Sequence, residues 1–411
     1  MSNAFSFDIL LGAASAATQI EGGNLDHSWN YWAWKGRIKD GSSPTRANDH
    51  FNRWREDVRL MRKMGLRCYR FGIEWARIEP IEGKFDNEAF EFYRELITEL
   101  LNADIMPLLT LHHFTNPMWF EKKGAFERKE NFMFFLRFIE VVIVRLGDLV
   151  SEYITINEPN VYAVHGYVFG AWPPGKKSVL SGLKIMKNMA VCHIEAYKAI
   201  HKIRKKLGYL DTKVGFANHV RVFDPKNINN PIHNIFASIN KYFFQDKLWK
   251  KCGKYSDFIA INYYTRSKCE AKIGEVKPDN VPINDLGWEI YPHGIVRCAL
   301  ELYDSVQLPI YITENGTCDN TDAFRSRYVY EHLKELCESE LPVERYYHWC
   351  FTDNFEWLEG ESARFGLVHI DYETQKRTIK KSGRFYMDMI INSGVTEEMY
   401  KKYIADEEYH M

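Results

Sequence analysis

Apolar and polar positions along the chain alternate between two periods. Short apolar or β-rich runs, typical of buried strands, occur at Phe7–Ala16, Cys68–Trp75, Ile105–His112, Tyr153–Ile156, Lys213–Asn218, Phe258–Tyr264, Pro309–Thr313 and Tyr346–Phe351. Segments with helical spacing separate them, at Asn48–Met64, Asn87–Asn102, Asn131–Leu149, Ser181–Leu207, Ile232–Lys250, Glu289–Ser305 and Ala323–Ser339, and Lys376–Ile391 closes the chain. Such alternation implies parallel strands with helical crossovers, and eight units favour a closed (β/α)8 TIM barrel over an open sheet.

The pattern predicts one domain over residues 1–411. The 411 residues exceed the length of about 250–300 at which single cores usually stop growing. No Pro/Gly/Ser-rich linker, repeat or low-complexity tract divides the chain. We therefore expect a single barrel with long loop insertions at its C-terminal face. Residues 1–5 are expected to be a disordered or artificially added terminus.

Two of the predicted strands end in a carboxylate. Thr155-Ile156-Asn157-Glu158-Pro159 is an apolar run that Pro159 must stop, because proline cannot donate to a sheet ladder. Pro309–Thr313 likewise runs into Glu314 and then into the turn residues Asn315-Gly316. An acid at one strand end is usually a helix cap or a solvated loop residue. Because the strand ends of a barrel gather at one mouth, the repeated pattern makes Glu158 and Glu314 candidates for a catalytic pair.

The other predicted strand ends are polar and aromatic. They carry Gln19, Arg70, His113, Asn262, Tyr264, Trp349, Glu356 and Trp357. A pyranose has hydroxyls on its rim and C–H groups on its faces, so its site needs amides, carboxylates and imidazole around flat aromatic rings. Taken singly, Arg70 would be a structural ion-pair member, Gln19 a loop residue and Trp349 a core residue. Their joint placement after successive strands favours a sugar site.

Composition and charge exclude some other partners. The net charge of −1, from 54 basic and 55 acidic residues, gives no overall field for nucleic acid or an anionic membrane. No apolar run reaches 18 residues and no signal peptide is evident, so a cytoplasmic enzyme is expected. The eight cysteines are scattered without a CxxC pair, which indicates buried free thiols and neither zinc nor disulfides.

These motifs together resemble glycoside hydrolase family 1, the β-glucosidase and β-galactosidase family. The similarity rests on Thr155–Pro159 and Ile312–Gly316. It extends to Ala16–Gly22, Tyr69–Phe71, Asn262–Tyr264, Asp353–Trp357 and Arg364–Leu367. It therefore spans nearly the whole chain in matching order.

The resemblance implies a retaining hydrolysis of β-glycosides by double displacement. Glu314 would be the nucleophile and Glu158 the acid/base. Arg70 and Tyr264 would hold Glu314 ionised, and Asn157 would bind the sugar 2-hydroxyl. The resemblance further implies that the substrate contacts are Gln19, His113, Asn262, Trp349, Glu356, Trp357 and Phe365. No cofactor or metal is expected, and the partner would be a small β-glycoside or short oligosaccharide. The oligomeric state is left open.

The chain departs from the family pattern in places, and three alternatives remain. Thr18 stands where Tyr is usual, and Phe114-Thr115-Asn116 replaces Trp-Asp-Leu, which should reshape the leaving-group site. A 6-phospho-β-glycosidase of the same family is one alternative, although its Ser-Lys-x-Tyr pattern is Ser362-Ala363-Arg364-Phe365 here. A carbohydrate-binding protein without activity would have lost one carboxylate. A metal-dependent barrel hydrolase would need paired histidines, and His112 next to His113 is expected to point away from the site.

Overall fold

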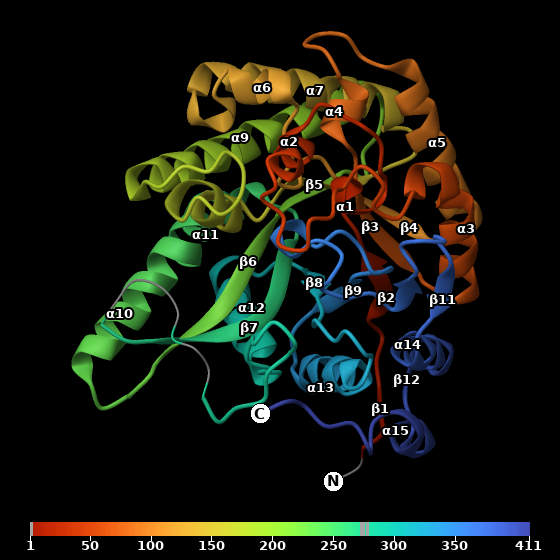
Figure 1. The fold of residues 1–411 in the computed structure, drawn as a ribbon, viewed down its shortest axis with the longest axis vertical. Coiled ribbons are helices and arrows are strands. Elements are labelled where there is room, and N and C mark those ends of the chain that lie inside the picture. The colour runs from red at the N-terminus through yellow and green to blue at the C-terminus, as the bar shows by residue number, and fades with distance from the viewer. Residues whose placement is uncertain (1–2, 272–275, 277–278) are drawn as a thin grey trace.

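Eight parallel strands close into a barrel in this computed structural model, which describes residues 3–271, 276 and 279–411 (Figure 1). Each strand pairs with the next in chain order, and β9 returns to β2. The strands are β2 (Leu10–Ala14), β3 (Cys68–Gly72), β4 (Met106–Thr110), β5 (Glu152–Asn157), β6 (Lys213–Pro225), β7 (Ile259–Cys269), β8 (Ile310–Asn315) and β9 (Val343–Trp349). The predicted TIM barrel is confirmed, and each observed strand overlaps one of the predicted runs.

Helices surround the barrel on its outer side (Figure 1). The long ones are α3 (His50–Lys63), α5 (Asn87–Asn102), α7 (Phe132–Leu146), α9 (Val179–Lys206), α10 (Pro231–Lys241), α12 (His293–Val306), α13 (Arg325–Glu338) and α14 (Lys381–Asn392). Short helices lie at the strand ends or in the loops and include α1 (Ala17–Ile20), α2 (Ser28–Trp34), α4 (Trp75–Ile78), α6 (Met118–Lys122), α8 (Pro159–Ala163), α11 (Lys247–Cys252) and α15 (Glu397–Tyr403). Within the described residues, none of the helices has the length and apolar character needed to cross a bilayer.

Three predicted helices differ from the observed ones. The predicted Glu289–Ser305 begins only at His293, as α12, because Glu289 forms a β-bridge with Ile283. The segment Ile232–Lys250 is interrupted by a π-helical turn, η4 (Tyr242–Asp246), between α10 and α11. At the C-terminal end, Arg377–Ile379 forms β11 against β10 (Val368–Ile370), so α14 begins only at Lys381. The reason lies in Arg377, whose buried guanidinium binds Asp57 Oδ1 at 2.9 Å and draws this stretch across the surface of α3.

The N-terminal residues lie beside the C-terminal part of the chain. Phe5–Ser6 forms β1, which pairs with β12 (Gly394–Val395). The backbone N–H of Asn3 donates to Glu397 Oε1 at 2.7 Å. Asn3, Phe5 and Ser6 thus contact the C-terminal part of the chain, and residues 1–2 lie outside the described residues. Whether the terminus is disordered or artificially added stays a prediction.

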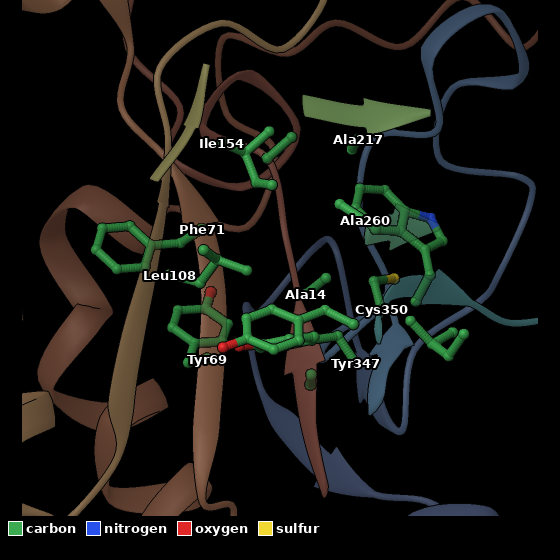
Figure 2. Close-up of a cluster of buried hydrophobic side chains, with 14 of the residues drawn as sticks. Ala14, Tyr69, Phe71, Leu108, Ile154, Ala217, Ala260, Tyr347 and Cys350 are labelled. Carbon is green, nitrogen blue, oxygen red and sulfur yellow. The ribbon is translucent and has the colours of Figure 1, made fainter. Parts of the chain in front are cut away.

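The core follows the strands and the helices packed on them. Figure 2 shows buried side chains supplied by successive strands, among them Ala14, Tyr69, Phe71, Leu108, Ile154, Ala217, Ala260 and Tyr347. At the start of β5 a buried ion pair joins Glu152 to Arg345 of β9. The opposite, carboxyl ends of the strands carry the predicted functional residues. Burial of large apolar side chains around the strands therefore provides a rigid frame for that end.

Candidate active site

A pocket of about 190 Å³ opens at the carboxyl ends of the strands. Of the residues predicted for the site, it is lined by His113, Glu158, Tyr264, Glu314, Trp349, Glu356, Trp357 and Phe365. Arg70, Asn157 and Asn262 lie behind this lining, fully buried and hydrogen-bonded to it. The structure thus brings together residues as far apart in the sequence as Arg70 and Phe365.

Glu314 is held by two donors at the end of β8. Arg70 Nη1 donates to Oε1 at 2.6 Å, and the Tyr264 hydroxyl donates to Oε2 at 2.6 Å. Two residues after Glu314, the backbone of Trp349 packs directly against Gly316. A Cβ at Gly316 would lie 1.9 Å from the carbonyl oxygen of Trp349. Both carboxylate oxygens are therefore positioned by donors from other strands, the guanidinium from β3 and the hydroxyl from the adjacent β7.

Glu158 has an unusual backbone conformation. Its φ of 41° lies in the left-handed region, which residues other than glycine seldom adopt. Pro159 follows at the first position of α8, where its fixed φ suits a helix start. The Glu158 backbone N–H donates to Ala217 O on β6 at 2.8 Å. This turn ends β5 and directs the Glu158 side chain into the pocket, and such strain is typical of functional positions.

The Glu158 carboxylate receives both of its hydrogen bonds on one oxygen. Asn262 Nδ2 donates to Oε1 at 2.8 Å, and His219 Nδ1 lies 3.1 Å from the same atom. Among the described residues, Oε2 has no hydrogen-bond partner. It is therefore the oxygen available to a ligand.

Asn157 links the two carboxylates through a shared network. Its Oδ1 accepts from Arg70 Nη2 at 2.6 Å and from Asn262 Nδ2 at 3.1 Å. Its Nδ2 must then be the donor to His113 Nε2, at 3.0 Å. One guanidinium and two amides thus span the distance between Glu158 and Glu314.

The charge on one carboxyl group affects the pKa of the other. Burial and the charge of Glu158 raise the pKa of Glu314 to about 7, against the lowering effect of Arg70 and Tyr264. Burial also raises the pKa of Glu158, but a positively charged His219 and the hydrogen bonds from His219 and Asn262 would lower it further than burial raises it. The charge of Arg70 and the hydroxyl of Tyr264 favour the ionised form of Glu314, whereas Glu158 is contacted by the amide of Asn262 and by His219.

One wall of the pocket is formed by Glu356 and three rings, and the buried Gln19 lies behind Glu356. Gln19 Nε2 donates to Phe355 O at 2.9 Å and to Glu356 Oε2 at 3.3 Å. His113 stacks between Trp349 and Trp357, with ring centroids 5.7 Å apart in both pairs. Burial and the charge of Glu314 raise the pKa of Glu356 to about 8, although hydrogen bonds from Trp349 and Gln19 lower it.

Two buried polar atoms at this wall lack a partner among the described residues, namely Gln19 Oε1 and His113 Nδ1. Because Asn157 donates to His113 Nε2, the ring hydrogen lies on Nδ1 and can donate. One acceptor and one donor are therefore left for a ligand hydroxyl, since buried polar groups rarely remain unsatisfied.

The neighbouring histidine points the other way, as predicted from strand alternation. His112 Nε2 lies 2.9 Å from Asn116 Oδ1, and its ring packs edge-on against Phe126 and Tyr162. His112 and His113 therefore do not form the paired ligands that a metal-dependent hydrolase would need.

The departures at Thr18 and Thr115 compensate for each other. Thr18 Oγ1 donates to Glu74 Oε2 at 2.6 Å and lies 2.6 Å from Thr115 Oγ1. Phe114 instead lines the pocket and packs against Trp172. The altered segment thus forms a buried polar cluster on one side and an apolar pocket wall on the other.

Sequence reasoning missed part of the site. The pocket is also lined by His165, Trp172, His219, Arg221 and Trp288. A usable signal existed for His219, because it directly follows Asn218, the last residue of the fifth predicted strand, as polar residues follow the other strands. Trp172 and Trp288 come from loops, and no periodic pattern locates a loop side chain.

Comparison with known proteins identifies the family. The model of glycosyl hydrolase family 1 matches residues 1–275 and 256–395. This chain belongs to glycosyl hydrolase family 1. Among solved structures, the β-glycosidase from Pyrococcus horikoshii is similar to it with a TM-score of 0.88 and 34% identity over 98% of both chains. Among curated relatives, β-glucosidase A of Thermotoga maritima is 30% identical over 96% of this chain and 99% of its own. The structure of a Thermotoga maritima β-glucosidase in complex with glucoimidazole has a TM-score of 0.87, with 29% identity over 96% of this chain and 100% of that one.

The family 1 assignment agrees with the geometry. A glycoside hydrolase needs two carboxyl groups at one pocket, and this family 1 barrel presents Glu158 and Glu314 there.

Proposed function

We propose that this family 1 enzyme is a retaining β-glycosidase that releases terminal β-D-glucosyl residues, and β-galactosyl or β-fucosyl residues as further substrates. The observation that carries the proposal is the unequal environment of the two carboxyl groups. Glu314 contacts a guanidinium and a phenol, whereas Glu158 contacts neutral donors on one oxygen only. Such a pair supplies one ionised nucleophile and one protonated acid.

In the first step, Glu314 attacks the anomeric carbon while the bond from that carbon to the leaving oxygen breaks. The proton on Glu158 Oε2 passes to this oxygen, so the aglycone leaves as a neutral alcohol. Asn157 would hydrogen-bond the sugar 2-hydroxyl, a contact that strengthens as the ring gains oxocarbenium character. The step ends with a covalent glycosyl ester on Glu314.

In the second step, Glu158 acts as a base. Its ionised Oε2 takes a proton from water as the water oxygen attacks the anomeric carbon and the ester bond to Glu314 breaks. Two inversions at one carbon restore the β configuration. Retention requires carboxyl groups about 5–5.5 Å apart, which we expect for this pair.

The sugar would lie between the polar wall and the aromatic rings. Gln19 Oε1, His113 Nδ1 and Glu356 are available for the hydroxyls of the sugar ring. Asn262 would act indirectly, by donating hydrogen bonds that position Asn157 and Glu158. Trp349, Trp357 and Phe365 would pack on the C–H faces.

The 6-phospho-β-glycosidase alternative has less support. Arg364 and Lys380, the cations near the Ser362–Phe365 stretch, both bind Asp353, at 3.0 and 2.6 Å. A phosphate beside Glu356 would therefore have to compete with Asp353 for these two cations.

The proposed reaction needs only two carboxyl groups and water, so no cofactor is part of the proposal. We also propose a cytoplasmic location, which the eight free cysteines support because disulfides are rare in reducing compartments.

Glu314→Ala and Glu158→Ala test the two roles. Glu314→Ala should abolish turnover of every β-glycoside. Glu158→Ala should slow the glycosylation step of unactivated glycosides by about 10²–10⁴-fold and spare 2,4-dinitrophenyl β-glucoside, whose leaving group needs no proton. Azide should accelerate the second step of Glu158→Ala and yield a β-glycosyl azide. If both substrates lost glycosylation rate equally in a pre-steady-state burst, the role of Glu158 as the acid would be wrong.

A further inference from the structure

His219 holds a specific hydrogen-bonded place between Glu158 and Arg221. It lies on β6 in register with Asn262 of β7, so both residues reach Glu158 Oε1 from adjacent strands. Its ring is buried, stacks on Tyr264 at 5.8 Å and meets Phe244 edge-on at 5.7 Å. Ring contacts on two sides therefore fix the orientation of the imidazole.

The second ring nitrogen of His219 identifies the tautomer. Nε2 lies 3.0 Å from Arg221 Nη2, and a guanidinium nitrogen can only donate. Nε2 must therefore be the acceptor, which places the ring hydrogen on Nδ1. That hydrogen is then donated to Glu158 Oε1.

The same contacts keep His219 neutral. Burial lowers the pKa of His219, and the charge of Arg221 lowers it further, although Glu158 raises it. Burial lowers the pKa of Arg221 only to about 10, so the guanidinium remains charged at neutral pH. If His219 were protonated, its Nε2–H would face an N–H of Arg221, and two positive charges would lie side by side.

We propose that His219, with its tautomer set by Arg221, is the positioning residue that keeps the proton of Glu158 on Oε2. This inference rests on the proposed function and assigns a role beyond the two carboxylates. Because His219 and Asn262 both donate to Oε1, that atom is the carbonyl oxygen of the protonated acid, and Oε2 carries the proton toward the leaving oxygen. After the transfer, the same N–H groups stabilise the carboxylate that must act as base.

Several other charged or titratable groups face Glu158, and each must stay constant in a test. They are Arg70 of β3, His165 of η3 (Val164–Val168), Arg221 of β6, Tyr264 of β7 and Glu314 of β8. Substitution of His219 itself leaves all five in place.

His219→Leu removes the donor, and His219→Asn places an amide N–H near the position of Nδ1. His219→Leu should lower kcat/KM for phenyl β-glucoside by about 10²-fold and that for 2,4-dinitrophenyl β-glucoside by less than about 3-fold, since only the former needs an oriented acid. His219→Asn should restore the ratio of the two values to within about 3-fold of wild type. His332→Leu, which removes a buried histidine of α13, is the matched control and should leave the ratio unchanged. Equal losses on both substrates in His219→Leu, or no rescue by asparagine, would overturn the proposal.

The tautomer has its own readout in the imidazole ¹⁵N spectrum of histidine-labelled protein, with the His219 signal assigned by its loss in His219→Asn. The wild type should show a neutral ring protonated on Nδ1 from about pH 5.5 to 8, and Arg221→Met should let that ring titrate. A wild-type ring protonated on Nε2 would contradict the inference. If the enzyme cleaved no aryl β-glycoside, the proposed function would fail, while this spectrum would still decide where the hydrogen of His219 lies.

Discussion

The protonation of Glu356 predicts how the enzyme discriminates against a 6-phosphorylated sugar. With a pKa of about 8, Glu356 is largely neutral at pH 7 and ionised at pH 9. A 6-phosphate would bring a charge of about −1.5 to −2 to this wall. If it approached an ionised Glu356 to ~4 Å at an effective dielectric constant of ~20, the repulsion would cost about 4 kcal/mol per unit pair. Protonating Glu356 at pH 9 costs only about 1.4 kcal/mol, so the bound complex takes up a proton instead.

The ratio of kcat/KM for p-nitrophenyl β-glucoside to that for its 6-phosphate should therefore depend on pH. It should be flat from pH 7 to 8 and rise by up to about tenfold per pH unit above 8. Ionisation of Glu158 and Glu314 affects both substrates and cancels in this ratio. Glu356→Gln, which keeps the size of the side chain, should make the ratio independent of pH while weakening glucoside turnover. A wild-type ratio that stays constant up to pH 10, or an equal slope in Glu356→Gln, would refute the reasoning.

Three further predictions concern the nucleophile. Tyr264→Phe removes the 2.6 Å hydrogen bond to Glu314 Oε2; a bond to a charged group is worth about 1.5–3 kcal/mol, so kcat/KM should fall by about 10–100-fold. Because the lost donor favoured the ionised form, the acidic limb of the kcat/KM profile should also move to higher pH, and an unmoved limb would contradict this account. In the wild type, the alkaline limb should lie above the ordinary pKa range of a glutamic acid, because burial and mutual repulsion raise the higher titration of the Glu158–Glu314 pair; an alkaline limb within that ordinary range would exclude this assignment. Gly316→Ala forces a Cβ to 1.9 Å from Trp349 O, so thermal denaturation should show a loss of about 1–3 kcal/mol together with reduced kcat. Gly208→Ala, whose Cβ meets nothing within 4 Å but whose backbone φ is +91°, should lose some stability and leave kcat unchanged.

The hydrophobic pattern by itself determined the barrel. Strands buried on both faces have short apolar sequences, and amphipathic helices have apolar residues with a period of 3.6. Both patterns are local, so the sequence alone predicts these elements. Proline and glycine after Glu158 and Glu314 marked the strand ends for the same local reason. The predicted bounds of α5, Asn87–Asn102, agree with the structure to the residue. In the structure Asp86 caps this helix, because its Oδ1 accepts from the N–H groups of Glu88 and Ala89.

Only the tertiary structure decided which polar groups contact one another. Glu158 and His219 are 61 residues apart, and they form a hydrogen bond because β5 and β6 are neighbours in the barrel. Arg221 is only two residues from His219, but nothing in the local sequence indicates that their side chains are in contact. The exchange of a predicted helical turn for β11 likewise depends on a buried ion pair between Arg377 and Asp57, 320 residues apart. Periodicity records burial along one segment, whereas a pKa, a tautomer or a long-range ion pair depends on distances between segments, which the closed barrel sets.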